Sequence, residues 1–225
     1  MISLGGFDFH LYGLILGVAI LSALQVSLRF AKERGVEQEK VEKAFWWALV
    51  GGVVGARIYH VVHLWGEVYS LNPIRALYVW QGGLGIWGAI LGGLMGLIFF
   101  NLKTKNRGFA ILDVMLIGMP LAQAIGRLGN WANGELYGKN GEPLFIWESI
   151  LNLTLFVILW RVGKQKKVTG RITGTYLIGY GAIRVFLENF RPDNIIWKWQ
   201  GIPVAVIAGG LSLISGLFIL RKKQS

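Results

Sequence analysis

Cysteine is absent from this sequence of 225 residues. The absence excludes a disulfide framework, a thiolate metal site and a cysteine nucleophile, so any thiol in its chemistry must come from a substrate. Charged residues are also scarce, at 16%, whereas soluble domains contain about 25%. Apolar residues make up 54% of the chain and occur in runs of about 20, the length that crosses a bilayer. The composition predicts an all-α, multi-pass integral membrane protein.

The apolar runs predict a bundle of seven transmembrane helices in a single domain, residues 1–225. The predicted spans are approximately 9–28, 44–64, 83–101, 109–126, 144–161, 172–190 and 202–220. No basic segment or cleavage site of a signal peptide precedes the first run, which is therefore interpreted as a retained span.

Basic residues between the spans predict the orientation. Most of the 23 Lys and Arg residues lie in four segments on the same side of the bundle, 29–43, 101–108, 161–171 and 221–223. The positive-inside rule then places the N-terminus outside and the C-terminus in the cytoplasm. The net charge of +11 is explained by this pattern facing anionic lipid, and no nucleic-acid partner is needed.

The segment 126–138 reads Gly-Arg-Leu-Gly-Asn-Trp-Ala-Asn-Gly-Glu-Leu-Tyr-Gly, directly after an apolar run. Because each glycine costs about 1 kcal/mol inside a helix, we expect the helix to end here. Four polar side chains would then lie on irregular backbone: Arg127, Asn130, Asn133 and Glu135. Such backbone at membrane depth is tolerated where it lines a cavity or is buried in protein, so this segment predicts a site.

Other polar residues fall in the outer half of the predicted spans: Tyr12, Arg57, Glu148, Arg184 and Glu188, with Asp113 as the exception. Charges at that depth are costly unless they are paired or hydrated, which favours a shared cavity on the outer side. Arg184, Glu188 and Arg191 share one helical face by their spacing. For Arg191, simple pairing at the interface is an equal alternative.

Two weaker patterns are interpreted without a cofactor. His60 and His63 lie near Arg57 without further ligands at compatible spacing, so we expect polar lining of the cavity and no metal. Residues 83–88 match G-x-G-x-x-G but lack the strand and acidic residue of a dinucleotide site. Glycines at every fourth position, 51 and 55 and then 88, 92 and 96, predict close helix–helix packing.

The segment 126–138 resembles the signature of bacterial prolipoprotein diacylglyceryl transferases, Gly-Arg-x-Gly-Asn-aromatic-x-Asn-Gly-Glu ending in glycine. Tyr12-Gly13, the run 55–57 (Gly-Ala-Arg) and the segment 184–193 (Arg-x3-Glu-x2-Arg-x-Pro-Asp) resemble other parts of that family, so the resemblance covers essentially the whole chain. Trp87 stands where the family often has histidine, which puts in doubt a mechanism with that histidine as base. The outer loops are short, which indicates a reduced periplasmic head.

The resemblance implies transfer of the sn-1,2-diacylglyceryl group from phosphatidylglycerol to the lipobox cysteine of a prolipoprotein signal peptide. This is the first step of bacterial lipoprotein maturation, and it leaves glycerol phosphate and needs no cofactor. The enzyme would lie in the inner (plasma) membrane with its active site facing the outer leaflet.

The same resemblance suggests roles for the polar residues. Arg127 would bind the phosphate, and Arg184 would stabilise the departing phosphate or lower the thiol pKa. Glu135 and Glu188 would hold these arginines, and Asn130 would orient the glycerol. Tyr12 would supply a hydroxyl, and the remaining lipid contacts would be Asn133, Arg57 and Arg191. The proton acceptor stays open between His60, His63 and no dedicated base.

Two other functions remain open at this point. A membrane transporter would favour repeated halves that meet at the midplane, whereas no repeat is found and the polar groups gather toward one side. A family member with altered activity would follow from Trp87.

Overall fold

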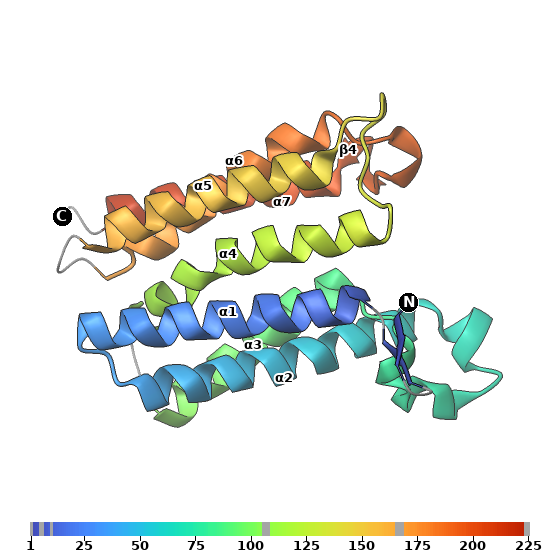
Figure 1. The fold of residues 1–225 in the computed structure, drawn as a ribbon, viewed down its shortest axis with the longest axis horizontal. Helices are drawn as coiled ribbons and strands as arrows, with labels where there is room; N and C mark the ends of the chain where they lie inside the picture. Colours follow the sequence, from blue (N-terminus) through green and yellow to red (C-terminus); the bar gives the residue numbers. More distant parts are fainter. Residues whose placement is uncertain (1, 5–6, 10, 105–108, 165–168, 223–225) are drawn as a thin grey trace. The chain divides into compact units, whose positions relative to one another are not determined.

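Seven long α-helices account for most of the chain in the computed structural model, which describes residues 2–4, 7–9, 11–104, 109–164 and 169–222 (Figure 1). They are α1 (Leu11–Arg34), α2 (Gln38–His63), α3 (Ile86–Thr104), α4 (Ala110–Ala132), α5 (Leu144–Lys164), α6 (Arg171–Glu188) and α7 (Val204–Arg221). Two short hairpins join β1 (Ile2–Leu4) to β2 (Phe7–Phe9) and β3 (Lys198–Trp199) to β4 (Ile202–Pro203). Single helical turns occupy Trp65–Tyr69, Pro73–Leu77, Val79–Gln81 and Asp193–Ile195.

Every predicted span corresponds to one of these helices. By length and composition, six of the described helices could cross a membrane: α1, α2, α3, α4, α5 and α7. The prediction of a polytopic, all-α membrane protein is thus confirmed. Helix α6 contains Arg171, Arg184 and Glu188 within 18 residues, so its sequence is less apolar than the others, and the seventh crossing stays a prediction. Several helices also extend past the apolar runs, because charged residues such as Lys32 and Arg34 continue the helical backbone.

The chain forms two compact units, one of Met1–Val36 with Gly108–Ser225 and one of Glu37–Arg107. In the first unit, α4 contacts α1, α5 and α6, while α6 also packs against α5 and α7. Helix α4 is accordingly the most buried of the six candidate spans. Its side chains Val114, Ile117 and Ala124 lie in the core. The polar motif at the end of α4 is therefore attached to the central helix of this unit.

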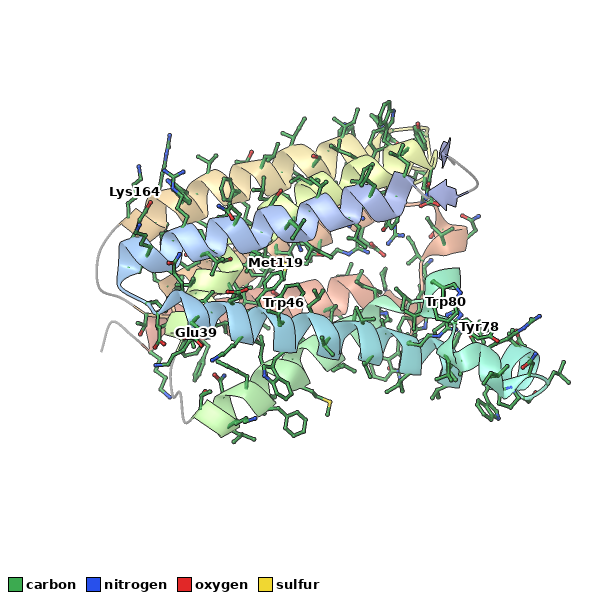
Figure 2. The ribbon with its side chains drawn as sticks, turned by 60° about the horizontal axis from the view of Figure 1, so that its bottom comes forward. Glu39, Trp46, Tyr78, Trp80, Met119 and Lys164 are labelled. Carbon is green, nitrogen blue, oxygen red and sulfur yellow. The ribbon has the colours of Figure 1, made fainter. Side chains whose placement is uncertain are left out.

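The second unit is built on the close approach of α2 and α3. A Cβ atom on Gly55 would collide with the Gly88 carbonyl oxygen, and one on Gly51 with that of Gly92. A Cβ atom on Gly88 or Gly92 would collide in the same way with the carbonyl oxygen of its partner glycine on α2. The predicted close packing through glycines is confirmed. Such contacts stabilise helix pairs in lipid, where apolar side chains gain little by leaving the hydrocarbon. Figure 2 shows Glu39 and the stacked pair Tyr78 and Trp80 at opposite ends of α2.

Asp113 fixes the beginning of α6 from a neighbouring helix. Its buried carboxylate accepts hydrogen bonds from the backbone N–H groups of Gly170 (2.5 Å) and Thr173 (2.9 Å), and from the Thr173 hydroxyl (2.5 Å). The residue before α6 is Gly170, which has no side chain that could cap the helix. A carboxylate at this end also interacts favourably with the positive end of the helix dipole. Asp113 therefore caps the N-terminus of α6 from α4. This structural role explains why Asp113 lies apart from the polar residues that were predicted in the outer half of the spans.

Replacing Gly92 by alanine should destabilise the protein by about 1–3 kcal/mol, because the new methyl group overlaps backbone that cannot move aside cheaply. The measurement is the melting temperature in detergent, followed by tryptophan fluorescence. Gly93→Ala is the matched control, since its Cβ would lie 3.4 Å from the nearest atom, the Ala48 carbonyl oxygen. Equal melting temperatures for the two variants would contradict the helix packing described above.

Replacing Asp113 by alanine should cost about 2 kcal/mol or more, because the buried N–H groups of α6 lose their charged acceptor. Asp113→Asn keeps one acceptor oxygen and should fall between alanine and the parent protein. Thermal unfolding measures the effect. Asp193→Ala removes a carboxylate whose side chain is 84% exposed, and it should leave the melting temperature nearly unchanged.

Candidate functional site

The polar motif begins inside α4, and here the sequence prediction was wrong. Arg127 and Asn130 lie on the last helical turns, which continue to Ala132 through Gly126 and Gly129. The helical cost of Gly129 is offset by packing, because a Cβ atom there would approach the Tyr12 ring to 2.7 Å. The glycine thus admits the aromatic ring of α1. Irregular backbone starts at Asn133, so only Asn133 and Glu135 match the prediction on this point.

The helix ends in a glycine-dependent turn. Gly134 has a φ of +67°, and its N–H donates to the Trp131 carbonyl at 3.0 Å, while Glu135 donates its N–H to the Asn130 carbonyl at 2.8 Å. These two bonds form a Schellman motif, in which a left-handed residue satisfies the last carbonyls of a helix. The turn brings the Glu135 side chain back toward the end of α4.

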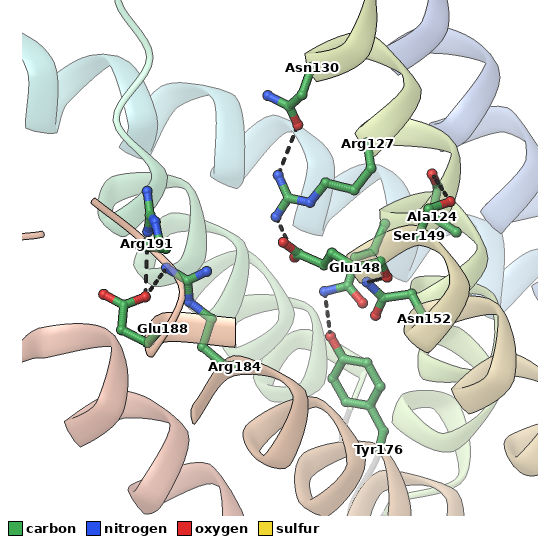
Figure 3. Close-up of polar contacts among 11 residues, drawn as sticks. Ala124, Arg127, Asn130, Glu148, Ser149, Asn152, Tyr176, Arg184, Glu188 and Arg191 are labelled. Carbon is green, nitrogen blue, oxygen red and sulfur yellow. Dashed lines mark hydrogen bonds and ion pairs between the residues drawn. The ribbon is translucent and has the colours of Figure 1, made fainter. Parts of the chain in front are cut away.

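Arg127 has its carboxylate partner on the next helix. Its Nη2 atom lies 2.5 Å from Glu148 Oε1 on α5, and its Nη1 donates to Asn130 Oδ1 at 3.0 Å (Figure 3). Glu135 contacts Arg127 only indirectly, since it accepts from the amides of Asn130 and Asn133 at 3.3 Å each. The network therefore runs from Glu148 through Arg127 and Asn130 to Glu135.

The second charged group lies at the end of α6. Glu188 Oε2 is 3.2 Å from an Arg184 nitrogen and 3.6 Å from an Arg191 nitrogen, so one carboxylate serves two cations (Figure 3). The Glu188 and Glu148 side chains are 3% exposed, whereas Arg184 and Arg191 are each 21% exposed and Arg127 is 28% exposed. In both groups the carboxylate is buried and the arginine side chain is partly exposed.

Tyr180 lies near both charged groups. This half-buried side chain on α6 lies within electrostatic range of Glu148, Arg184 and Arg127. Its ring stacks on Tyr176, whose hydroxyl accepts from Gln123 at 3.0 Å. The two charged groups therefore share one neighbourhood between α4, α5 and α6.

Sequence reasoning missed the polar contacts beneath this neighbourhood. Ser149 donates to the Ala124 carbonyl at 3.0 Å and Asn152 to the Glu148 carbonyl at 2.9 Å, in addition to the pair of Gln123 and Tyr176. Their one sequence signal is a series of polar residues at helical spacing inside apolar runs, such as Glu148 and Asn152. The bonds of Ser149 and Gln123 join different helices, as polar contacts in membrane bundles do, whereas that of Asn152 lies within α5. We assign these residues to the support of the site.

The connection between α4 and α5 also contacts the end of α6. Lys139 donates its N–H to the Phe190 carbonyl at 2.8 Å, and a Cβ on Gly138 would lie 3.0 Å from that same oxygen. Glu142 accepts from the side chain and the N–H of Asn140, both at 2.9 Å, and these bonds lower its pKa from the ordinary value. Glycine at 138 is required for this close approach, which ties the motif to the residue before Arg191.

In the second unit, Arg57 organises the connection between α2 and α3. Its buried guanidinium donates to four backbone carbonyls, those of Arg75 (2.5 Å), Ala76 (2.9 Å), Gly82 (2.6 Å) and Gly83 (3.2 Å). The contacts shape this loop, and the predicted contact of Arg57 with lipid stays a prediction. His63 stacks on Tyr59 and His60 meets Tyr69 edge-on. Across the residues that the structure describes, no three His, Asp or Glu side chains are arranged to hold a metal ion.

Comparison with known proteins identifies the family. The sequence profile described as "Prolipoprotein diacylglyceryl transferase" matches residues 1–221. The chain belongs to this family of transferases. It is 32% identical over 241 residues to the phosphatidylglycerol–prolipoprotein diacylglyceryl transferase of Clostridioides difficile, covering 99% of this chain and 96% of that protein. It is similar to proteins of the same name from Symbiobacterium thermophilum (32% over 242 residues; 97% and 90%) and Synechococcus elongatus (30% over 256 residues; 100% and 88%).

The resemblance inferred from the motif is thereby confirmed at the level of the family. Within this member of the transferase family, Tyr12, Arg127, Asn130, Asn133, Glu135, Arg184, Glu188 and Arg191 all lie in the first unit. Arg57, His60, His63 and Trp87 lie in the second. The predicted residues of the first unit thus form two charged groups on α4, α5 and the end of α6, while Arg57 shapes a loop of the second unit.

The ion pair of Arg127 and Glu148 should be worth about 1.5–3 kcal/mol, because hydrogen bonds to charged groups in a shielded place are stronger than neutral ones. A double-mutant cycle with Arg127→Gln and Glu148→Gln, measured by unfolding in mixed detergents, isolates this coupling. The pair of Glu39 and Lys43 is the control. It has the same distance of 2.5 Å but is exposed to solvent, so its coupling should be clearly smaller. Equal couplings would contradict a shielded pair at the site.

Proposed function

We propose that this protein transfers the diacylglyceryl group of phosphatidylglycerol to the lipobox cysteine of a prolipoprotein signal peptide, the first step of lipoprotein maturation. The observation that carries the proposal is the pair of partly exposed arginine groups, each paired with a buried glutamate. The guanidinium fork matches phosphate oxygens, and the carboxylates behind it hold the fork in place. The relatives' names state the same activity for those proteins.

The charges of the two groups differ, which suggests a division of work. Arg127 pairs with Glu148 and is linked through Asn130 to a second carboxylate, Glu135, so this group has no positive charge in excess. Arg184 and Arg191 share Glu188 and leave one positive charge in excess. A phosphodiester carries one negative charge and gains charge as its ester bond breaks. We therefore propose that Arg127 binds the phosphate of the intact lipid. Arg184 and Arg191 would stabilise the negative charge that develops on the phosphate as glycerol phosphate leaves.

Unpaired donors support an oxygen-rich ligand at this place. The Nε atoms of Arg127 and Arg191 are buried and have no hydrogen-bond partner among the described residues. Buried donors are normally paired, since an unmade bond is costly. Phosphate or glycerol oxygens would satisfy both once the guanidinium groups turn toward the ligand, since neither nitrogen is exposed in this conformation.

In the proposed reaction, the cysteine sulfur attacks the glyceryl carbon that bears the phosphate. A carbon–sulfur bond forms, the carbon–oxygen bond to phosphate breaks, and the electron pair of that bond leaves with glycerol phosphate. The thiol proton is released to solvent or to a base that stays unassigned. Asn130 and Asn133 would contact the headgroup, and Tyr12 would add its hydroxyl. Glu148, Glu188 and Glu135 are positioning residues in this scheme.

The topology belongs to the same proposal. All seven helices, α6 included, would cross the bacterial inner membrane as a single catalytic domain with the N-terminus outside and the site toward the outer leaflet. The support is the concentration of basic residues at the helix ends opposite the site, such as Lys32 and Arg34 on α1 and Arg161 and Lys164 on α5. A transporter is disfavoured, because the chain belongs to a transferase family.

Arg184→Ala and Arg127→Ala should each lower the transfer rate by about 100-fold or more, since each removes a fixed cation from the developing phosphate charge. The assay follows transfer from phosphatidylglycerol vesicles to a lipobox peptide with purified protein. Arg184→Lys should keep part of the rate, because the charge remains while the planar fork is lost.

Arg161→Ala is the control, since Arg161 lies in the last turn of α5, away from the site. Its rate should equal that of the parent protein. Unchanged rates for both site variants would refute the proposed roles. If the parent protein itself showed no transfer, the result would instead favour the alternative suggested by Trp87, a family member with altered activity.

A further inference from the structure

A small hairpin separates the charged end of α6 from α7. Strands β3 and β4 pair antiparallel, with Trp199 opposite Ile202 and Lys198 opposite Pro203. The two residues between them, Gln200 and Gly201, both have positive φ angles, +49° and +81°. Positive φ at both central positions defines a type I′ turn, whose twist matches that of the flanking strands. The segment therefore has a defined pair of faces.

One face of the hairpin is apolar and exposed. Trp199 and Ile202 are direct cross-strand neighbours on this face, and Trp197 is the exposed residue directly before β3. The exposed fractions of these side chains are 61%, 51% and 59%. Lys198 points to the opposite face and pairs with Asp193 at 2.8 Å. The hairpin is thus apolar on one face and charged on the other.

This arrangement needs a partner surface. A two-stranded hairpin is marginally stable in water even when it is longer than this one, and two exposed tryptophans within three residues are unusual outside binding or membrane surfaces. The contacts given by the chain itself are at its base, where Val204 donates its N–H to the Trp197 carbonyl at 3.0 Å. Trp199 and Ile202 stay more than half exposed among the residues that the structure describes.

Chain continuity identifies the partner. Helix α7 begins at Val204, directly after β4, and it is one of the six helices apolar enough to cross a membrane. The hairpin therefore stands where a crossing helix meets the membrane surface, whichever side that is. Tryptophan is enriched at this level of membrane proteins, because its ring suits both the hydrocarbon and the headgroups.

We propose that the face formed by Trp199 and Ile202 is a lipid-binding surface that inserts into the headgroup region of the bilayer and anchors the junction of α6 and α7. Lys198 and Asp193 remain on the aqueous side. This anchor acts independently of the transfer reaction, and it fixes the membrane depth of the helix end that carries Glu188.

The absence of cysteine makes a direct test simple. Trp199→Cys, Ile202→Cys and Lys198→Cys are each labelled with a nitroxide in the full-length protein, reconstituted into phosphatidylglycerol–phosphatidylcholine vesicles. Spin relaxation by oxygen, which partitions into lipid, is compared with relaxation by an aqueous nickel chelate. Melting temperatures equal to that of the parent establish that the labelled proteins are folded.

Labels at positions 199 and 202 should show a several-fold higher ratio of oxygen to nickel accessibility than the label at 198, which lies on the opposite face. Nickel accessibility at 199 and 202 equal to that at 198 would place the hairpin in water and overturn the proposal. Protection from both reagents would mean that protein covers the face, and it would overturn the proposal equally.

Discussion

The pairing of buried glutamates with partly exposed arginines is the interaction on which the site depends. A lone charge at membrane depth costs several kcal/mol, and a buried carboxylate without a partner would take up a proton instead. Glu148 and Glu188 are compatible with their surroundings because a guanidinium lies within ion-pair distance of each. The same contacts restrict the rotamers of the arginines, which are otherwise long and flexible. Stability and preorganisation therefore come from one set of contacts.

The helices that carry these pairs are held by devices suited to lipid. Small residues allow backbones to meet, as at Gly181 with Gly209 and at Gly118 with Ala23. Hydrogen bonds such as that of Gln123 with Tyr176 join helices at fixed heights. Asp113 sets the start of α6, and therefore the height of Arg184 and Glu188, which lie about four to five turns later on the same helix. Rigid placement of a site by its supporting shell is a general requirement of catalysis.

Much of this architecture could be predicted from the sequence, because it follows from local patterns. Apolar runs located all seven helices, and helical spacing correctly paired Arg184 with Glu188 on α6. Arg191 also contacts Glu188 but lies past the end of that helix, so the prediction of one helical face was wrong for it. The partner of Arg127 could not be found in the same way, since Glu148 is 21 residues away on another helix. The continuation of α4 through Gly129 was also missed, because the compensating Tyr12 ring comes from a distant segment. Local propensity failed where tertiary packing decided the outcome.

The bond between Lys139 and Phe190 has a consequence for protein engineering. The connection between α4 and α5 is short and exposed around Asn140, features that usually mark a tolerant position for an epitope tag. Here, however, its backbone is fastened to the end of α6. A tag inserted at this point would pull on the helix that bears Glu188, so solvent exposure alone is a poor guide to where this chain accepts an insertion.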